Sequence, residues 1–158
     1  MADAVTIDER AGLFLASILA RKAADHAAIA RICGGPVLLP TGPGTWLAIG
    51  DAALDALPER LAGFAFVSDQ SGAYVLYRIA GPDARRLLQR GLSIDLHPDA
   101  FPPGAVAVSA IAHIGVIVRA LDDGGGFDVA VPRSLAGSFR HWAAGVCAAL
   151  APSSPTLM

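Results

Sequence analysis

The side chains that could carry chemistry are few and lie far apart in the sequence. The four histidines, at positions 26, 97, 113 and 141, include no pair four residues apart, and no His-Glu-x-x-His or Cys-x-x-Cys motif occurs. Those spacings place metal ligands on one helix face or around one turn, so a metal site would have to be assembled from scattered positions. The pattern favours surface or hydrogen-bonded histidines, and we predict no metal site.

Nucleophilic and phosphate-binding signatures are also missing. No Gly-x-Ser-x-Gly elbow occurs; a catalytic set could be drawn only from Ser71, His97 and Asp95, and a turn is the simpler interpretation of Ser71. The glycine run 124–126 lacks the Lys-Ser/Thr of a P-loop and follows two aspartates, which would repel phosphate. No dinucleotide fingerprint opens a helix after a strand. We therefore predict no catalytic residue and no cofactor-binding residue in this chain.

Composition restricts the class of protein further. The chain has 158 residues, of which 54% are hydrophobic and 16% charged, and its formal net charge is −2. Such a chain can bury a core without disulfides, and its two cysteines, Cys33 and Cys147, form no disulfide framework. The lack of basic excess argues against nucleic-acid binding, and the apolar content excludes global disorder. The apolar excess indicates a permanent protein partner.

No segment is predicted to cross a membrane or to direct secretion. The least polar stretch, 104–118, is shorter than the ~20 residues of a membrane-spanning helix and contains Ser109 and His113. The apolar run 11–20 follows no positively charged leader. We expect a cytoplasmic protein that binds neither membranes nor nucleic acid.

Hydrophobic periodicity predicts a mixture of short strands and helices. Strands are predicted over 37–39, 46–49, 64–68, 74–79, 106–111, 116–121 and 127–131, while 13–20 is ambiguous between strand and helix. Helices are predicted over 23–33, from an N-cap at Asp51 to Leu61, from Pro82 to Gly91, and from Pro132 to Leu150. In the strand 127–131 apolar residues alternate with Asp128 and Ala130, which is typical of a half-buried strand.

These elements predict an α+β fold of mainly antiparallel sheets with helices on one side, because the later strands are joined as hairpins. We predict a single domain over 1–158, with two ferredoxin-like subdomains at 1–66 and 67–150 and a flexible tail at 151–158. Within this fold, the helix from Pro82 to Gly91 carries the one local basic cluster.

An ordered series of motifs covering about residues 7–150 resembles the gamma subunit family of heterotetrameric sarcosine oxidase. The series is Gly42-Pro-Gly-Thr-Trp46, Ser68-Asp-Gln-Ser71, Gly81-Pro-Asp-Ala-Arg-Arg-Leu-Leu, Asp95-Leu-His97-Pro-Asp-Ala-Phe101-Pro-Pro-Gly104, Phe127-Asp-Val-Ala-Val-Pro132-Arg-Ser134 and Ser138-Phe-Arg-His-Trp142. The runs that begin at Asp95 and Phe127 are the specific ones. The run at Gly81 is weaker because Gly-Pro-x-Ala recurs in the folate-binding, aminomethyltransferase-like relatives.

The resemblance implies a place in a flavoenzyme complex. Such complexes oxidatively demethylate sarcosine or a related N-methyl amine, and tetrahydrofolate can capture the released one-carbon unit. The implied partners are alpha, beta and delta subunits, chiefly alpha, and the implied FAD, FMN, NAD, tetrahydrofolate and zinc belong to those partners. The resemblance also implies an aminomethyltransferase-like fold without a cofactor of its own, which agrees with the empty motif search.

Two classes of function follow. The first is a non-catalytic gamma subunit that acts in assembly, with long polar side chains on apolar faces as its interface residues: Arg85, Arg86, Arg90, His97 and Arg133. The second is a stand-alone folate-binding one-carbon protein, in which Asp69, Asp95 or Asp128 would hold the pterin. A scaffold for another oxidoreductase shares the first prediction but not the identity of the partner.

Overall fold

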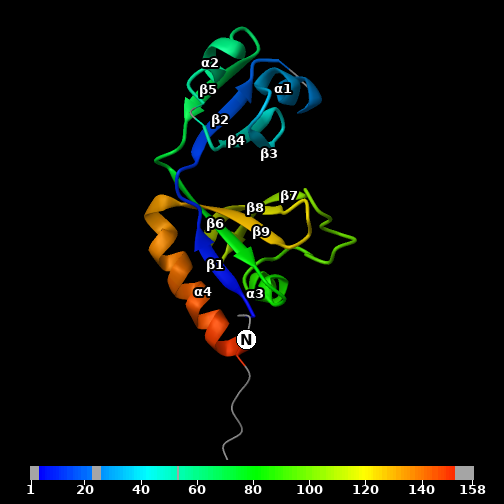
Figure 1. Cartoon of the computed structure of the whole chain (residues 1–158), viewed down its shortest axis with the longest axis vertical. Helices are drawn as coiled ribbons and strands as arrows, with labels where there is room; N and C mark the ends of the chain where they lie inside the picture. Colours follow the sequence, from blue (N-terminus) through cyan, green and yellow to red (C-terminus); the bar gives the residue numbers. More distant parts are fainter. Residues whose placement is uncertain (1–3, 23–25, 53, 152–158) are drawn as a thin grey trace, which may run out of the picture.

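The computed structural model describes residues 4–22, 26–52 and 54–151 of the chain. It shows two bodies placed end to end, each built on one antiparallel sheet (Figure 1). Residues 23–25 of the predicted helix 23–33 and residues 152–158 of the predicted tail lie outside the described residues. In the part that is described, no helix is long and apolar enough to cross a membrane.

The smaller body contains a four-stranded sheet in the order β3-β4-β2-β5. Its strands are β2 (Phe14–Ala20), β3 (Val37–Gly42), β4 (Thr45–Gly50) and β5 (Ala65–Asp69). Helices α1 (His26–Cys33) and α2 (Leu57–Arg60) cover one face of this sheet. On that face Ile29 and Leu61 pack against Ile18 and Trp46, which forms the core of the smaller body.

The larger body contains a five-stranded sheet in the order β1-β6-β9-β8-β7. Its strands are β1 (Thr6–Glu9), β6 (Tyr74–Ala80), β7 (Val106–Ile111), β8 (Ile114–Ala120) and β9 (Gly126–Pro132). One face is covered by helix α3 (Ala84–Gln89), which lies between β6 and β7 in the chain, and by α4 (Ala136–Leu150), which follows β9 through a 3-10 turn (Arg133–Leu135). Leu87, Leu88 and Phe139 are fully buried there against Tyr77 and Val129.

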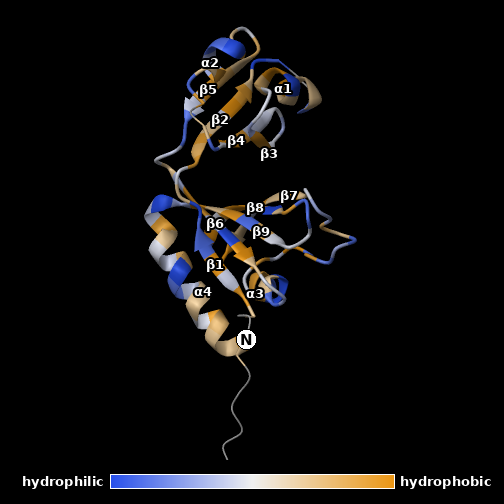
Figure 2. Cartoon of the chain, viewed as in Figure 1, coloured by the Kyte–Doolittle hydropathy of each residue, from blue (hydrophilic) through white to orange (hydrophobic). Residues whose placement is uncertain are grey.

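The two bodies meet through the sheet faces that carry no helices. Side chains alternate between the faces of a strand, so Leu47 and Ile49 point away from the helices of the smaller body. Both pack in a shared cluster with Leu76, Ile117 and Ala130 of the larger sheet. Figure 2 shows apolar residues reaching this waist from both sides. The helices therefore lie on the outer faces, and a small apolar contact joins the sheets.

The hydroxyl of Tyr77 is a weak point in the larger core. The side chain is 2% exposed, its ring stacks on Phe139 with the centroids 5.1 Å apart, and its hydroxyl has no hydrogen-bond partner among the described residues. Burial raises the pKa of this hydroxyl above its ordinary value. An unpaired buried hydroxyl costs about 1–3 kcal/mol, so the ring stabilises the core and the oxygen weakens it.

The substitution Tyr77→Phe is therefore expected to leave the free energy of unfolding unchanged or to raise it by about 1 kcal/mol. Urea denaturation followed by circular dichroism measures this change, and Tyr74→Phe, at a half-buried position on the opposite sheet face, is the matched control. A clear loss of stability in Tyr77→Phe alone would mean that the hydroxyl has a partner, such as a buried water.

The predicted α+β class with antiparallel sheets is confirmed. The ambiguous run 13–20 is the strand β2, because β4 and β5 pair with its two edges. Strand β1 was not predicted, since Thr6–Glu9 is short and polar and forms only by pairing with β6. The predicted N-cap at Asp51 is wrong: α2 begins at Leu57, with Pro58 in the first turn, where a missing N–H costs nothing.

The predicted half-burial of the strand 127–131 is also wrong, because Asp128 and Ala130 are as buried as their apolar neighbours. The two sheets do not separate at one point of the chain. β1 precedes the whole smaller sheet yet belongs to the larger one, and β5 runs past position 66. The division into subdomains 1–66 and 67–150 stays a prediction.

Candidate functional site

Two of the four histidines, His26 and His97, accept hydrogen bonds through Nδ1. Trp46 Nε1 donates to His26 Nδ1 at 2.6 Å, and the Asp99 amide donates to His97 Nδ1 at 3.3 Å. His113 lies at positive φ in the tight turn between β7 and β8. Among the described residues, no three His, Cys, Asp or Glu side chains are grouped so that they could hold a metal ion.

Ser71, the serine of the possible catalytic set, forms hydrogen bonds with the backbone of a neighbouring strand. Ser71 Oγ accepts a hydrogen bond from the Leu15 amide at 3.0 Å and donates to the Leu15 carbonyl at 3.3 Å. Asp69 Oδ1 accepts from the Ser71 amide at 2.9 Å, and this bond lowers the pKa of Asp69. His97 instead pairs with Asp95 and Asp99 in the loop after α3, so Ser71 and His97 have separate partners.

A row of charges across the larger sheet was missed by the sequence reasoning. Asp128 is 3% exposed, and its two oxygens accept from Arg78 Nε and Nη2, both at 2.9 Å. Arg10 and Arg119 approach the same carboxylate at 3.6 and 3.9 Å. Strand register places Arg78 and Arg119 directly beside Asp128 on the two neighbouring strands. The available signal was one charge in the middle of each apolar strand, at β6, β8 and β9.

Asp128 therefore forms a structural ion pair with Arg78, and Arg10 and Arg119 lie close to the same carboxylate. The hydrogen bond to Asp128 raises the pKa of Arg78 above its ordinary value. Each carboxylate considered for a pterin already has an internal donor: the Ser71 amide at Asp69, the His97 amide at Asp95 and Arg78 at Asp128. Asp128 is therefore committed to an internal ion pair, whereas Asp69 and Asp95 are exposed carboxylates that each accept a backbone hydrogen bond.

Two of the predicted interface residues, Arg85 and Arg86, lie on α3, and a third, Arg90, is its C-cap. The three are named here the α3 arginine face. Arg86 and Arg90 are exposed, and Arg86 Nη1 donates to Asp83 at 2.8 Å. The Arg85 guanidinium lies 5.1 Å from the centre of the Phe127 ring, and its Nη1 is buried without a hydrogen-bond partner in the described part of the chain. His97 is exposed in the loop that follows α3.

The fifth predicted interface residue, Arg133, holds the connection between the two bodies. Its Nε donates to the Gly72 carbonyl at 2.9 Å, and its Nη2 donates to the carbonyls of Tyr74 and Ser71 at 3.0 and 3.3 Å. These acceptors lie in the turn that joins β5 to β6. These three hydrogen bonds, here called the Arg133 clasp, tie the 3-10 turn to the segment that connects the two bodies.

The substitution Arg133→Ala is expected to lower the free energy of unfolding by about 1–2 kcal/mol, because three carbonyls lose a charged donor at a site that stays partly hydrated. Thermal and urea unfolding measure the change. Arg140→Ala is the control, since Arg140 is exposed on α4. Equal stability of the two variants would mean that the clasp contributes nothing to folding.

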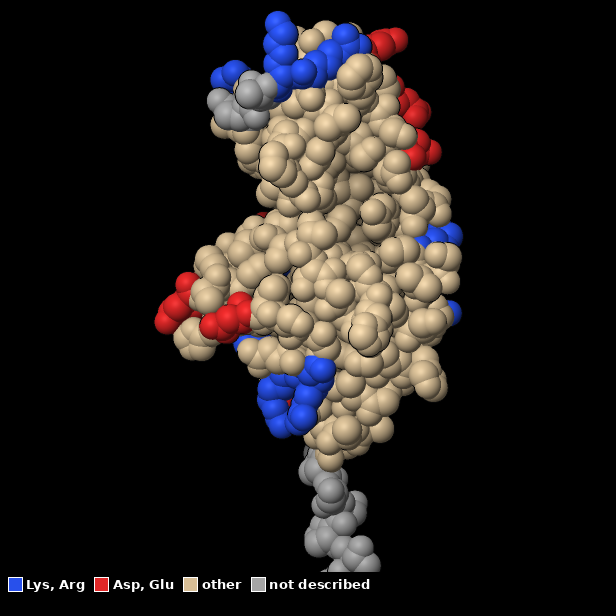
Figure 3. Space-filling view, turned by 180° about the vertical axis from the view of Figure 1, so that it is seen from behind, with Lys and Arg blue, Asp and Glu red and all other residues tan. Residues whose placement is uncertain are grey.

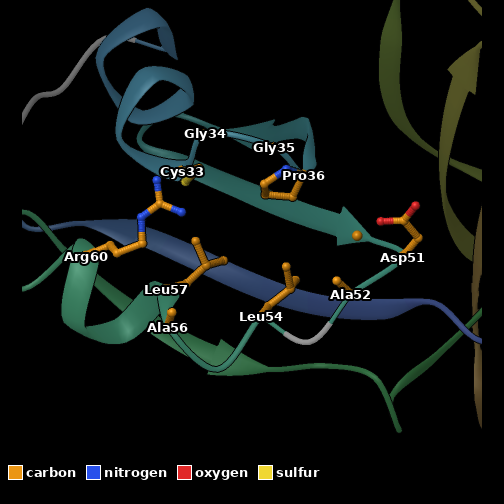
Figure 4. A pocket seen from close by; sticks show the side chains of 11 residues that line it. Cys33, Gly34, Gly35, Pro36, Asp51, Ala52, Leu54, Ala56, Leu57 and Arg60 are labelled. Carbon is orange, nitrogen blue, oxygen red and sulfur yellow. The ribbon is translucent and has the colours of Figure 1, made fainter.

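A pocket of about 230 Å³ opens beside the loop that ends α1 (Figure 4). Gly34, at φ +67°, lies so close to Arg60 that a Cβ atom there would meet the guanidinium at 2.6 Å. Cys33 at the same end of the helix is 1% exposed, and burial raises the pKa of its thiol while Arg60 lowers it less. The pocket is therefore lined by a buried thiol with a raised pKa and by an arginine packed on the helix end.

Comparison with known structures identifies the class of the fold. The chain matches heterotetrameric sarcosine oxidase from Corynebacterium sp. U-96, solved in complex with pyrrole 2-carboxylate, over 98% of its own length and 89% of that chain. The TM-score is 0.86 and the sequence identity 21%. No curated protein matches the sequence.

The comparison with protein families identifies the particular family. Residues 1–149 match the sarcosine oxidase gamma subunit family, and the chain belongs to that family. The resemblance found from the motifs is thereby confirmed.

Proposed function

We propose that this chain is the non-catalytic gamma subunit of a heterotetrameric sarcosine oxidase-type flavoenzyme, which oxidatively demethylates sarcosine or a related N-methyl amine. The family match over residues 1–149 carries the proposal. The engagement of Ser71, His97 and Asp128 in internal contacts supports it, because these side chains hold the chain together. Assembly and stability of the complex are the role assigned to the subunit.

The partners proposed are the alpha, beta and delta subunits, chiefly alpha, in the cytoplasm. The family resemblance implies that FAD, FMN, NAD, tetrahydrofolate and zinc belong to those partners, and this sequence carries no nucleotide or flavin fingerprint. The α3 arginine face, together with His97 and Arg133, is proposed to meet an acidic surface. Exposed arginines such as Arg86 and Arg90 suit such contacts because a guanidinium binds a carboxylate through two donors.

Coexpression of the tagged chain with the three partner subunits tests the proposal. We expect all four chains to copurify with flavin absorbance, and we expect omission of this chain to reduce the yield of complex. Recovery of a colourless chain alone, with an unchanged yield of active complex without it, would contradict the proposal. The double variant Arg86→Glu/Arg90→Glu tests the α3 arginine face, with Arg31→Glu on the smaller body as control.

A further inference from the structure

Two short segments carry the chain between the two bodies. Residues 10–13 lead from β1 of the larger sheet to β2 of the smaller one, and residues 70–73 return from β5 to β6. The pairing of β1 with β6 differs in register by one residue from that of β2 with β5. Glu9 pairs with Tyr77, whereas the register of β2 and β5 would place it opposite Leu76. Strand pairing is therefore interrupted at the crossing and does not by itself fix one sheet on the other.

Arg133 of the larger body holds the second crossing segment. Besides the three hydrogen bonds of the Arg133 clasp, to the carbonyls of Ser71, Gly72 and Tyr74, its backbone amide donates to the Ala73 carbonyl at 2.8 Å. Successive carbonyls of the segment thus accept from one residue. A guanidinium presents its donors in a rigid planar fork, so these bonds restrict the direction of the segment as well as its position.

Ser71 ties the same segment to the smaller body. A hydrogen-bonded antiparallel pair exchanges two backbone bonds. The Gln70 amide donates to the Leu15 carbonyl at 2.8 Å, but the Gln70 carbonyl accepts from the Ala73 amide in the turn. The Leu15 amide donates instead to the Ser71 hydroxyl at 3.0 Å. The Ser71 side chain therefore replaces a missing backbone bond at β2, while its carbonyl accepts from Arg133.

The apolar contact between the bodies leaves room for them to turn. A cavity of about 450 Å³ lies at the waist, and the two sheets line it from opposite sides, for example with Leu47 and Ile117. Figure 3 shows a notch between the two bodies at the surface. The crossing segments contain Gly12 and Gly72, and a Cβ atom at either position would meet nothing within 4 Å. A small contact between two units permits relative motion unless other bonds oppose it.

We propose that Ser71 and Arg133 form a polar joint that sets the angle between the two bodies. With the joint intact, the bodies hold the orientation of this structure. Without it, they turn about the crossing segments at Gly12 and Gly72, while each sheet keeps its own core. The proposal concerns this chain alone and does not depend on the partner subunits. It also gives a physical role to the two sequence motifs that contain Ser71 and Arg133.

Distances between spin labels on the two bodies test the joint. The labels are attached in the full-length chain at Arg31→Cys on α1 and Arg140→Cys on α4, because both positions are exposed. Cys147→Ala removes the half-buried thiol, and Cys33 is buried. Double electron–electron resonance then measures the distribution of distances between the bodies. We expect one population in this parent chain.

The joint is broken by Ser71→Ala, which removes the hydroxyl, and by Arg133→Gln, which removes the cationic fork. In each variant we expect a second distance population, whose ratio to the first rises about tenfold over the parent chain when the bonds of the joint are lost. Ser68→Ala and Arg86→Gln are the matched controls, since Ser68 is exposed on β5 and Arg86 donates to Asp83. Both controls are expected to keep the distribution of the parent chain.

A label pair within the larger body separates reorientation from loss of fold. Arg90→Cys with Arg140→Cys should keep its distance in both joint variants, and circular dichroism verifies that the variants are folded. Arg133→Lys, which keeps the charge and loses the fork, replaces Arg133→Gln if that variant does not fold. Parent distances between the bodies in folded variants of both Ser71 and Arg133 would overturn the proposal. Equal broadening of the pair within the larger body would overturn it as well.

Discussion

Replacing Asp128 with alanine is expected to lower the free energy of unfolding by about 3 kcal/mol. The carboxylate is almost completely buried and is the shared partner of Arg10, Arg78 and Arg119. Its removal leaves Arg10 and Arg78 without an ion-pair partner among the described residues, whereas Arg119 keeps its contact with Asp122. The loss lies at the low end for a broken buried ion pair because the side chains of Arg10 and Arg78 keep 35% and 36% exposure, so water can reach them.

Urea denaturation of Asp128→Ala and of the control Asp122→Ala measures the effect. Asp122 also contacts Arg119, at 2.6 Å, but its side chain is 76% exposed, and an exposed pair is worth at most about 1 kcal/mol. A difference of less than about 1 kcal/mol between the two variants would show that burial does not strengthen the row of charges. Asp128→Asn is expected to fall between them, since an amide oxygen still accepts from Arg78 without carrying charge.

Replacing Phe139 with alanine is expected to lower the free energy of unfolding by about 3–5 kcal/mol. Phe139 is fully buried between α4 and the larger sheet, with its ring 5.1 Å from Tyr77 and 5.9 Å from Trp142. The substitution removes both aromatic contacts and leaves a cavity that the five-stranded sheet cannot close. Helix α4 would lose the buried anchor of its first turn.

The control for this substitution lies one turn earlier in the chain. Leu135, which the sequence places on the same apolar stripe, is 38% exposed, so Leu135→Ala is expected to cost about 1 kcal/mol or less. Thermal unfolding compares the two variants. Similar losses at both positions would contradict the assignment of Phe139 as the anchor.

The α3 arginine face would act through charge, so its contribution to assembly should weaken as salt rises. A salt titration of the copurified complex, carried out with the wild type and with Arg86→Glu/Arg90→Glu, measures that contribution.

Much of the secondary structure was accessible from local patterns. The strand 106–111, the helix that begins after Gly81-Pro82-Asp83 and the long apolar stripe through Phe139 were predicted close to their observed positions. Alternation and helical spacing are visible in a short window because one face of each element is buried against one core. The residues alone also showed that the sequence lacks a catalytic motif and that it resembles the gamma subunit family.

The candidate site was less accessible because it depends on residues far apart in the chain. Arg78, Arg119 and Asp128 lie on three different strands, and only strand register places them in one row. Arg133 was predicted as an interface residue, and its clasp depends on the path of the turn 71–74.

Residue types and their local spacing were thus sufficient for the class of fold, the lack of a recognisable catalytic set and the membership of a family of subunits. Packing between distant segments was needed to place β1 in the larger sheet, to bury Asp128 among three arginines and to leave an apolar cavity at the waist. The physical reason is that hydrophobic periodicity reports burial of one face of one element. Pairing, register and the meeting of two sheets arise from contacts that no local window contains.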